Sequence, residues 1–293
     1  MTLKSWVLEY LQTYKCVNLK QSTLKSYLYA AQHIPDDLQI DQLTCKSIQG
    51  IINNMVFSGL SWSTVSHTYT LISQALSQAQ NYGFPDKSHL LKGIMLPKKQ
   101  KKRVRAFSPE QLQLFRAHNH GFHADHFSFL LLTGLRIGEL IGLQQQDLDI
   151  RRRCIQIQRN YYRGSFQTPK TDESQREIPL SAEAWRIVQK RIVLGRPAAP
   201  LFTGQTGRIL DYRSMLSAFT NLLQTAGLPH SGIHVLRHTF ATELLRRGVN
   251  LKIISDLLGH STIKTTCDIY SDVSLEMKFD AVSRFDLPEI ANK

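Results

Sequence analysis

Apolar side chains recur at steps of three and four residues through the first third of the chain, which is the spacing of one face of an α-helix. The pattern breaks at Pro35 and at Gly83, and Ser61 can cap the last and longest helix. The repeated positions fall into four groups: Trp6, Leu8, Tyr10 and Leu11; Leu24, Tyr27, Leu28 and Ala31; Ile48, Ile51, Ile52 and Met55; and Val65, Tyr69, Ile72, Leu76 and Ala79. We therefore predict a four-helix domain over residues 1–96.

The pattern after residue 106 is mixed, with helices at both ends and strands between them. Ser108 followed by Pro109 is typical of a helix start, and Gly134 ends a second helix and is followed at once by a third. Apolar and polar residues alternate around residues 155–162, and residues 165–167 and 176–178 continue after turns. These segments predict a three-stranded antiparallel meander. The chain is expected to be mainly α, with a second domain over residues 106–293 that holds this small sheet.

A basic segment separates the two patterns. Residues 97–105 contain six cations in nine positions, a density that disfavours independent folding. They are Lys98, Lys99, Lys101, Lys102, Arg103 and Arg105. A solvated surface run explains such a block, and so does an inter-domain linker that lies along DNA phosphates. Its position between two globular patterns favours the linker.

Composition narrows the class of partner. The 293-residue chain has a formal net charge of +13, which indicates a polyanionic partner and most often nucleic acid. The four cysteines are scattered without a C-x-x-C pair, and we expect a reduced intracellular protein. No run of apolar residues is long enough to span a membrane, and the N-terminus lacks the apolar block of a signal peptide.

Two arginine motifs in the second domain suggest anion chemistry. Arg136 and Glu139 are three residues apart, so they share a helix face. His234 and Arg237 have the same separation at a helix start, where backbone N–H groups and the helix dipole favour an anion. An ordinary helical ion pair would explain the first motif equally well. Tyr270, further along, is either a core aromatic or a nucleophile.

The order of these motifs resembles one known family. Residues 133–140 read Thr-Gly-Leu-Arg-Ile-Gly-Glu-Leu, residues 234–238 read His-Val-Leu-Arg-His, and Leu-Gly-His at 258–260 precedes Tyr270. Together they resemble the tyrosine recombinases, the phage integrases and Xer-type resolvases. The resemblance implies an N-terminal SAM-like core-binding domain and a C-terminal α-helical catalytic domain, in the simple Xer-like form without an arm-binding domain. The ten-residue step from His260 to Tyr270 resembles integrases of mobile elements more than many Xer-type members.

The resemblance also implies a reaction. It makes Tyr270 the nucleophile that attacks a DNA phosphodiester and forms a 3′-phosphotyrosyl link, without metal, cofactor or ATP. The remaining catalytic residues would be Arg136, Lys170, His234, Arg237 and His260. Lys170, in Pro-Lys-Thr ahead of Ile-Pro-Leu at 178–180, corresponds to the family's hairpin lysine, which protonates the 5′-hydroxyl leaving group. Glu139 would orient Arg136 or a histidine.

Partners and location follow from the same resemblance. We expect a double-stranded DNA recombination site, a homotetramer on DNA, and host DNA-bending proteins as accessory factors. The tail, residues 271–293, would dock on a neighbouring protomer or cover its own domain. A cytoplasmic, nucleoid-associated protein is expected. Polar residues of the first domain that are candidates for DNA contact, or simply a solvated face, are Lys20, Lys25, Tyr27, Tyr29, Ser66, His67 and Thr68.

Three other interpretations compete with this prediction. A type IB topoisomerase would use the same chemistry but relax DNA without exchanging strands. A catalytically silent DNA-binding regulator would keep the fold and the charge. The histidines at 118, 120, 123 and 126 could hold a metal, although no cysteine or carboxylate pair completes such a site.

Overall fold

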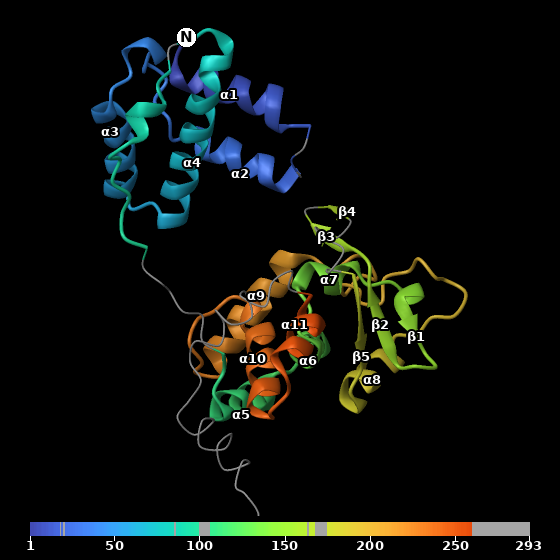
Figure 1. The fold of residues 1–293 in the computed structure, drawn as a ribbon. Coiled ribbons are helices and arrows are strands. Elements are labelled where there is room, and N and C mark those ends of the chain that lie inside the picture. The colour runs from blue at the N-terminus through green and yellow to red at the C-terminus, as the bar shows by residue number, and fades with distance from the viewer. Residues whose placement is uncertain are drawn as a thin grey trace, which may run out of the picture. The chain divides into compact units, whose positions relative to one another are not determined.

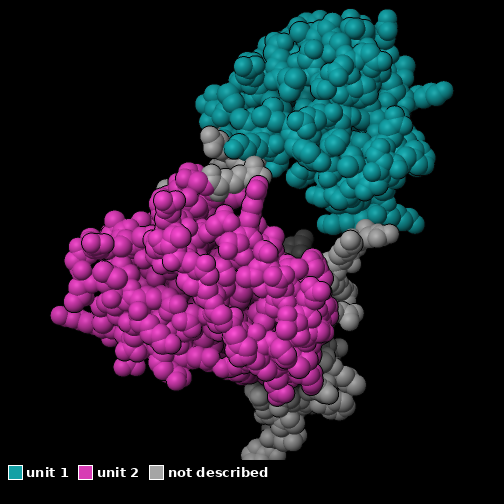
Figure 2. All heavy atoms as spheres, turned by 180° about the vertical axis from the view of Figure 1, so that it is seen from behind, with its two compact units in different colours: residues 1–102 teal, residues 103–293 magenta. Residues whose placement is uncertain are grey.

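The computed structural model describes residues 1–17, 19, 21–84, 86–99, 106–162, 164–167 and 175–259. The chain divides into two compact units, Met1–Lys102 and Arg103–Lys293, which Figure 2 shows in different colours. Each unit has its own hydrophobic core. Within the described ranges, no helix is long and apolar enough to cross a membrane.

Unit 1 is helical, as predicted. Its α-helices are α1 (Leu3–Tyr10), α2 (Gln21–Ala31), α3 (Cys45–Phe57) and α4 (Trp62–Ala79), seen in Figure 1. A π-helical turn over Leu11–Lys15 continues α1, and 3-10 turns span Ile40–Gln42, Gln80–Tyr82 and Ser88–Leu91. The side chains of Thr2, Thr44 and Ser61 each accept a backbone N–H three residues ahead, so a hydroxyl cap fixes where α1, α3 and α4 begin.

The core of unit 1 forms around α4. The side chains of Val65, Leu71 and Ile72 are fully buried there. Trp6 of α1 packs on the same core and donates its indole N–H to the carbonyl oxygen of Ala75 at 2.8 Å. Thr68 is also fully buried, and its hydroxyl lies within hydrogen-bond distance of the carbonyls of Ala30 and Thr64. The suggestion that Thr68 contacts DNA is therefore wrong, because its side chain faces the core of its own unit.

The start of the predicted linker is attached to unit 1. Gln49 of α3 bonds both the backbone N–H and the carbonyl of Met95, at 2.8 and 3.0 Å. Trp62 donates its indole N–H to the carbonyl of Pro97 at 2.9 Å, and the ammonium of Lys99 lies 4.9 Å from the centre of the Trp62 ring. The backbone up to Lys99 thus packs on α3 and the start of α4.

Unit 2 has a helical body and a small sheet. Its helices are α5 (Pro109–His118), α6 (Ala124–Thr133), α7 (Ile137–Gly142), α8 (Ala182–Gln189), α9 (Tyr212–Thr225), α10 (His234–Arg246) and α11 (Leu251–Leu258). A 3-10 turn spans Gln145–Asp147. The central helix is α6, because Phe127, Phe129 and Leu130 are buried on several of its faces. The prediction of a mainly α chain with a small sheet is confirmed.

The strand pairing differs from the predicted meander. β1 (Leu148–Asp149), β2 (Cys154–Ile157) and β5 (Arg176–Pro179) form an antiparallel sheet in the order β1-β2-β5. β3 (Asn160–Tyr162) and β4 (Ser165–Gln167) pair with each other in a separate hairpin. The strand expected at residues 165–167 is present and pairs with residues 160–162, but its predicted place in the middle of the sheet was wrong. Ile155 pairs with Ile178 in the core, whereas Ser165 and Phe166 are exposed and have no apolar alternation to bury beside β2.

Candidate active site

Arg136 is placed by a left-handed turn at the end of α6. Gly134 closes the helix at φ 66°, a conformation that favours glycine. A Cβ on Gly134 would also approach the Phe240 ring to 2.4 Å, so the position is closed to larger residues. Arg136 follows in extended conformation as the N-cap of α7. The chain therefore turns sharply here, and Arg136 caps a new helix instead of extending α6.

Glu139 holds Arg136 from within the same turn. One oxygen of its carboxylate accepts the backbone N–H of Arg136 at 2.8 Å, and the other accepts from its guanidinium at 2.7 Å. Glu139 is buried, whereas the Arg136 side chain keeps 37% of its surface exposed. The carboxylate of Glu139 thus holds both the backbone and the guanidinium of Arg136, while part of that side chain remains open to solvent.

Arg237 comes from the first turn of α10. It is buried, and its guanidinium donates to the carbonyl of Gly134 at 2.8 Å and to that of Leu258 at 2.6 Å. His234 is the first residue of the same helix. Its ring lies 5.0 Å from that of His238, edge to face. The helix start therefore brings a histidine and an arginine to the turn that carries Arg136.

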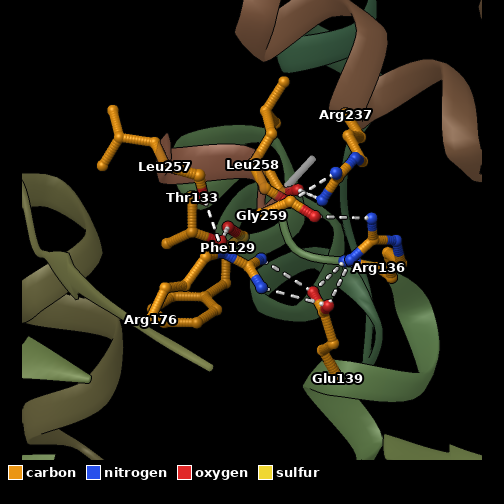
Figure 3. A network of polar contacts seen from close by, with 10 residues as sticks. Phe129, Thr133, Arg136, Glu139, Arg176, Arg237, Leu257, Leu258 and Gly259 are labelled. Atoms are coloured by element: carbon orange, nitrogen blue, oxygen red, sulfur yellow. Dashed lines mark hydrogen bonds and ion pairs between the residues drawn. The ribbon is translucent and has the colours of Figure 1, made fainter. Parts of the chain in front are cut away.

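The C-terminal end of α11 joins these elements. Its last carbonyls accept from three arginines in turn: Leu257 from Arg176 at 2.7 Å, Leu258 from Arg237, and Gly259 from Arg136 at 3.2 Å (Figure 3). Guanidinium groups at this end also complement the negative pole of the helix dipole. His260 follows Gly259 directly in the chain.

Arg176 is the residue of this network that the sequence did not reveal. Its guanidinium donates to both oxygens of Glu139, at 3.2 and 2.9 Å, and only 6% of its side chain is exposed. In the sequence it opens a strand, and no motif links it to residues 139 and 257. A buried arginine can be recognised only once its distant partners are known.

Glu139 is ionised because of the cations around it. Burial alone would raise its pKa, but the hydrogen bond from Arg176 and the charges of Arg176, Arg136 and Arg237 lower the pKa to about 2. One carboxylate is therefore surrounded by three guanidinium groups. The cluster therefore carries an excess of positive charge.

His234 is neutral at physiological pH. Loss of water around its ring, together with repulsion from His238, Arg237 and Arg136, lowers its pKa to about 4, against an opposing effect of Glu139. Although the residue as a whole is exposed, loss of water around the ring is the largest cause of this shift. Desolvation and Arg237 also lower the pKa of His238. Both imidazoles are thus available as neutral donors or acceptors.

The other predicted site residues divide between described and undescribed parts of the chain. Lys98 and Lys99 are exposed at the end of unit 1. Outside the described residues lie Lys101, Lys102, Arg103, Arg105, Lys170, His260 and Tyr270, together with the tail.

Part of the histidine cluster forms an aromatic contact. His123 and His126 pack against each other with ring centres 5.3 Å apart, and the ring of His126 also packs on Phe202. Burial, with His123 and Arg191 nearby, lowers the pKa of His126 to about 4. In the part of the chain that the structure describes, no three His, Cys, Asp or Glu side chains are grouped to hold a metal ion.

Comparison with known proteins agrees with this arrangement. The phage integrase family matches residues 95–277, and the chain therefore belongs to this family. The prediction of a tyrosine recombinase is confirmed.

Curated relatives include recombinases and a transposase. The chain is 28% identical to a XerC-like tyrosine recombinase of Caldanaerobacter subterraneus, over 84% of this chain and 71% of that one. It is 35% identical to the tyrosine recombinase XerC of a Mycobacterium strain, over 50% of this chain and 47% of the relative. It is 29% identical to the transposase from transposon Tn916 of Enterococcus faecalis, over 55% and 45%.

Solved structures of this family have the same fold. The Tn1549 transposon integrase, in complex with a circular intermediate DNA, matches with a TM-score of 0.83 and 24% identity, over 97% of this chain and all of that one. Lambda integrase bound to a core site matches with a TM-score of 0.75 and 19% identity, over 99% of this chain and all of the lambda chain.

Proposed function

We propose that this site-specific recombinase breaks and rejoins double-stranded DNA through a covalent link between Tyr270 and a 3′-phosphate. The observation that carries the proposal is the convergence of Arg136 and Arg237 on the carbonyls of Leu258 and Gly259, directly before His260. The two arginine motifs and the Leu258-Gly259 pair, which are distant in the sequence, meet at one place.

The proposed step is a transesterification. The phenol of Tyr270 loses its proton to water and its oxygen attacks the phosphorus, so that a P–O bond to tyrosine forms and the P–O bond to the 5′-oxygen breaks. Lys170 gives a proton to that leaving oxygen. Attack by the 5′-hydroxyl of another strand reverses the step and releases the tyrosine. Because the link conserves the phosphodiester bond energy, no ATP is consumed.

The arginines would stabilise the charge that develops on the phosphate. Arg136 and Arg237 would donate to the non-bridging oxygens, and His234 and His260 would add donors. Glu139 would act through Arg136, since its carboxylate bonds that side chain and is buried. A neutral His234 can still donate one N–H.

The DNA and assembly partners belong to this proposal. The relatives bound to DNA, and the lambda integrase tetramer on a Holliday junction, support a tetramer on a recombination site. We propose that the tail docks between protomers, that the linker cations contact phosphates, and that DNA-bending factors assist. Unit 1 would act as the core-binding domain.

Covalent capture tests the proposal. The protein is incubated in EDTA with a library of nicked duplexes whose arms are randomised, and adducts are resolved on a denaturing gel and sequenced. An adduct that is lost in Tyr270→Phe, and kept in the exposed control Tyr212→Phe, is the expected result. An adduct that survives in Tyr270→Phe would identify a different nucleophile. Tight DNA binding without any adduct would favour the silent regulator.

The recovered site also allows a test that distinguishes a recombinase from a type IB topoisomerase. A recombinase should exchange strands between two duplexes that carry the recovered site. Relaxation of supercoiled DNA by a monomer, with no exchanged product, would support a type IB topoisomerase.

A further inference from the structure

Arg176 connects two elements that each hold one end of the catalytic network. Its Nε donates to the carbonyl of Leu257 in α11, and its two terminal nitrogens donate to the two oxygens of Glu139 in α7. The residue itself belongs to β5. One planar side chain therefore links the sheet, the start of α7 and the end of α11 (Figure 3).

The geometry requires an arginine. Nε and the two terminal nitrogens bond three different oxygens at the same time, and only a guanidinium offers that fork of donors. The group is also packed closely, since a Cβ on Gly259 would approach a terminal nitrogen of Arg176 to 2.9 Å. Gly259, with φ 63°, thus lets the chain turn directly over this guanidinium.

We propose that Arg176 is a positioning residue of the cleavage reaction. It orients Glu139 and the end of α11, and through them it holds Arg136 and Arg237 in place for the scissile phosphate. Since only 6% of its side chain is exposed, it acts without touching DNA. This inference rests on the proposed function of the same site.

The route from Arg176 to the reacting groups is short. The carboxylate of Glu139 accepts from both Arg176 and Arg136. Loss of the Arg176 bonds would let this carboxylate rotate, and its rotation would move Arg136. The end of α11 accepts from Arg176 and, one residue later, from Arg237. A shift of about 1 Å in a catalytic group is enough to slow an enzyme about a hundredfold.

The same sheet offers a matched control. Arg152 donates two hydrogen bonds to the carboxylate of Glu177, both 2.7 Å long. Glu177 is the residue after Arg176 in β5. The side chain of Arg152 is 63% exposed. Arg152→Gln removes the same kind of bond from the same sheet, and exposed pairs contribute little to stability. Its cleavage rate should equal that of the wild type.

Two substitutions separate the charge of Arg176 from its shape. Arg176→Lys keeps a cation beside Glu139 but loses the planar set of N–H donors that bonds three oxygens at once. Arg176→Gln loses both. The charged and titratable groups that remain around Glu139 are Arg136 at the start of α7 and Arg237 and His234 on α10. In Arg176→Gln the pKa of Glu139 should rise, because the group whose bond and charge lower it most is gone.

The first measurement needs no DNA. The carboxyl carbon of Glu139 is followed by NMR as the pH is lowered in the wild type, Arg176→Lys and Arg176→Gln. We expect the titration to move toward neutral pH in Arg176→Gln and to stay low in Arg176→Lys. An unchanged titration in Arg176→Gln would overturn the proposed contact, whatever the protein does with DNA.

The second measurement is single-turnover cleavage of a nicked duplex that the wild type cuts. We expect a loss of about tenfold in Arg176→Lys at every pH, and of about a hundredfold in Arg176→Gln. In Arg176→Gln the loss should deepen as the pH falls, because Glu139 takes up its proton at a higher pH than in the wild type. The dissociation constant for DNA should not change.

The outcomes are distinguishable. Wild-type rates in both Arg176 variants, or an equal loss of DNA binding and cleavage without pH dependence, would overturn the positioning role. Failure of the wild type to form any adduct would instead refute the proposed function. Thermal unfolding of each variant shows whether it is folded, and Arg176→Lys keeps the test valid if Arg176→Gln is not.

Discussion

At the scale of single residues, the site depends on a charge imbalance. Three guanidinium groups surround the one carboxylate of Glu139, and two of the three are buried. Arg136 and Arg237 could be identified from the sequence because they belong to contiguous motifs. Arg176 could not, because its partners lie 37 and 81 residues away and no local spacing encodes such contacts. The two arginines proposed to be catalytic can thus be found from sequence motifs, whereas the arginine that contacts their network cannot.

The low pKa of Glu139 makes its contribution to stability depend on pH. The folded pKa of about 2 lies below the usual value of 4.5. The carboxylate therefore stabilises the fold fully above pH 4.5, and this contribution is lost as the pH falls from 4.5 to 2. The full effect corresponds to about 3 kcal/mol. In urea unfolding, Glu139→Gln should be less stable than the wild type at pH 7, with a gap that narrows toward pH 3. A gap that is independent of pH would contradict this account.

The imidazole of His234 should titrate far below the usual range. We expect its NMR titration midpoint near 4 in the free protein. Arg136→Gln should raise the midpoint, because Arg136 is one of the cations that lower it. A midpoint at the ordinary 6.5, unchanged by that substitution, would show that the ring is hydrated and distant from the arginines.

At the scale of elements, α7 and β3 are packed so closely that glycine is required between them. A Cβ on Gly138 would lie 2.1 Å from the side-chain oxygen of Asn160 and 2.8 Å from the carbonyl of Tyr161. A Cβ on Gly142, one turn later, would lie 3.2 Å from the carbonyl of Arg159. Helix starts were predictable because side-chain caps are local. Strand partners were not, because the pairing of β2 with β5 depends on which apolar faces reach the core.

Alanine at position 138 tests this packing. Gly138→Ala should destabilise the protein by about 1–3 kcal/mol, because β3 must move away from α7. Gly50→Ala in α3 is the control, since nothing lies within 4 Å of its added methyl group. That change should stabilise the helix by about 0.5–1 kcal/mol. Chemical unfolding of the two variants measures both effects, and a neutral Gly138→Ala would refute the close approach.

At the scale of the whole molecule, the chain combines two separate cores with a net charge of +13. The sequence located the change from one pattern to the next within residues 97–105. It did not reveal that Trp62 bonds Pro97 at the start of that segment, or that Gln49 bonds Met95 just before it, because both contacts are made by side chains of distant helices. Lys98 and Lys99 are therefore exposed at a fixed place on unit 1.

The proposed phosphate contacts of these lysines predict a salt effect. For B-DNA, each phosphate neutralised contributes about 0.9 to the slope of log affinity against log salt concentration. Replacing both Lys98 and Lys99 by glutamine should reduce the slope by about 1.8. Lys4→Gln, which removes a lysine paired with Asp36 at 2.9 Å, is the control and should leave the slope unchanged. An unaltered slope in the double variant would show that these two lysines do not contact phosphates.

Three arginines donate to the carbonyls at the end of α11, and these bonds decide whether their side chains lose conformational entropy on folding or on binding DNA. Fixing a long arginine side chain costs up to about 2 kcal/mol. Here the backbone carbonyls of residues 257–259 immobilise all three side chains in the free protein. This entropy is lost when the chain folds. The arginine side chains therefore have little conformational entropy left to lose when a phosphate binds. The entropy of DNA binding should therefore be dominated by released ions and ordered DNA, and these three arginines should contribute little to it.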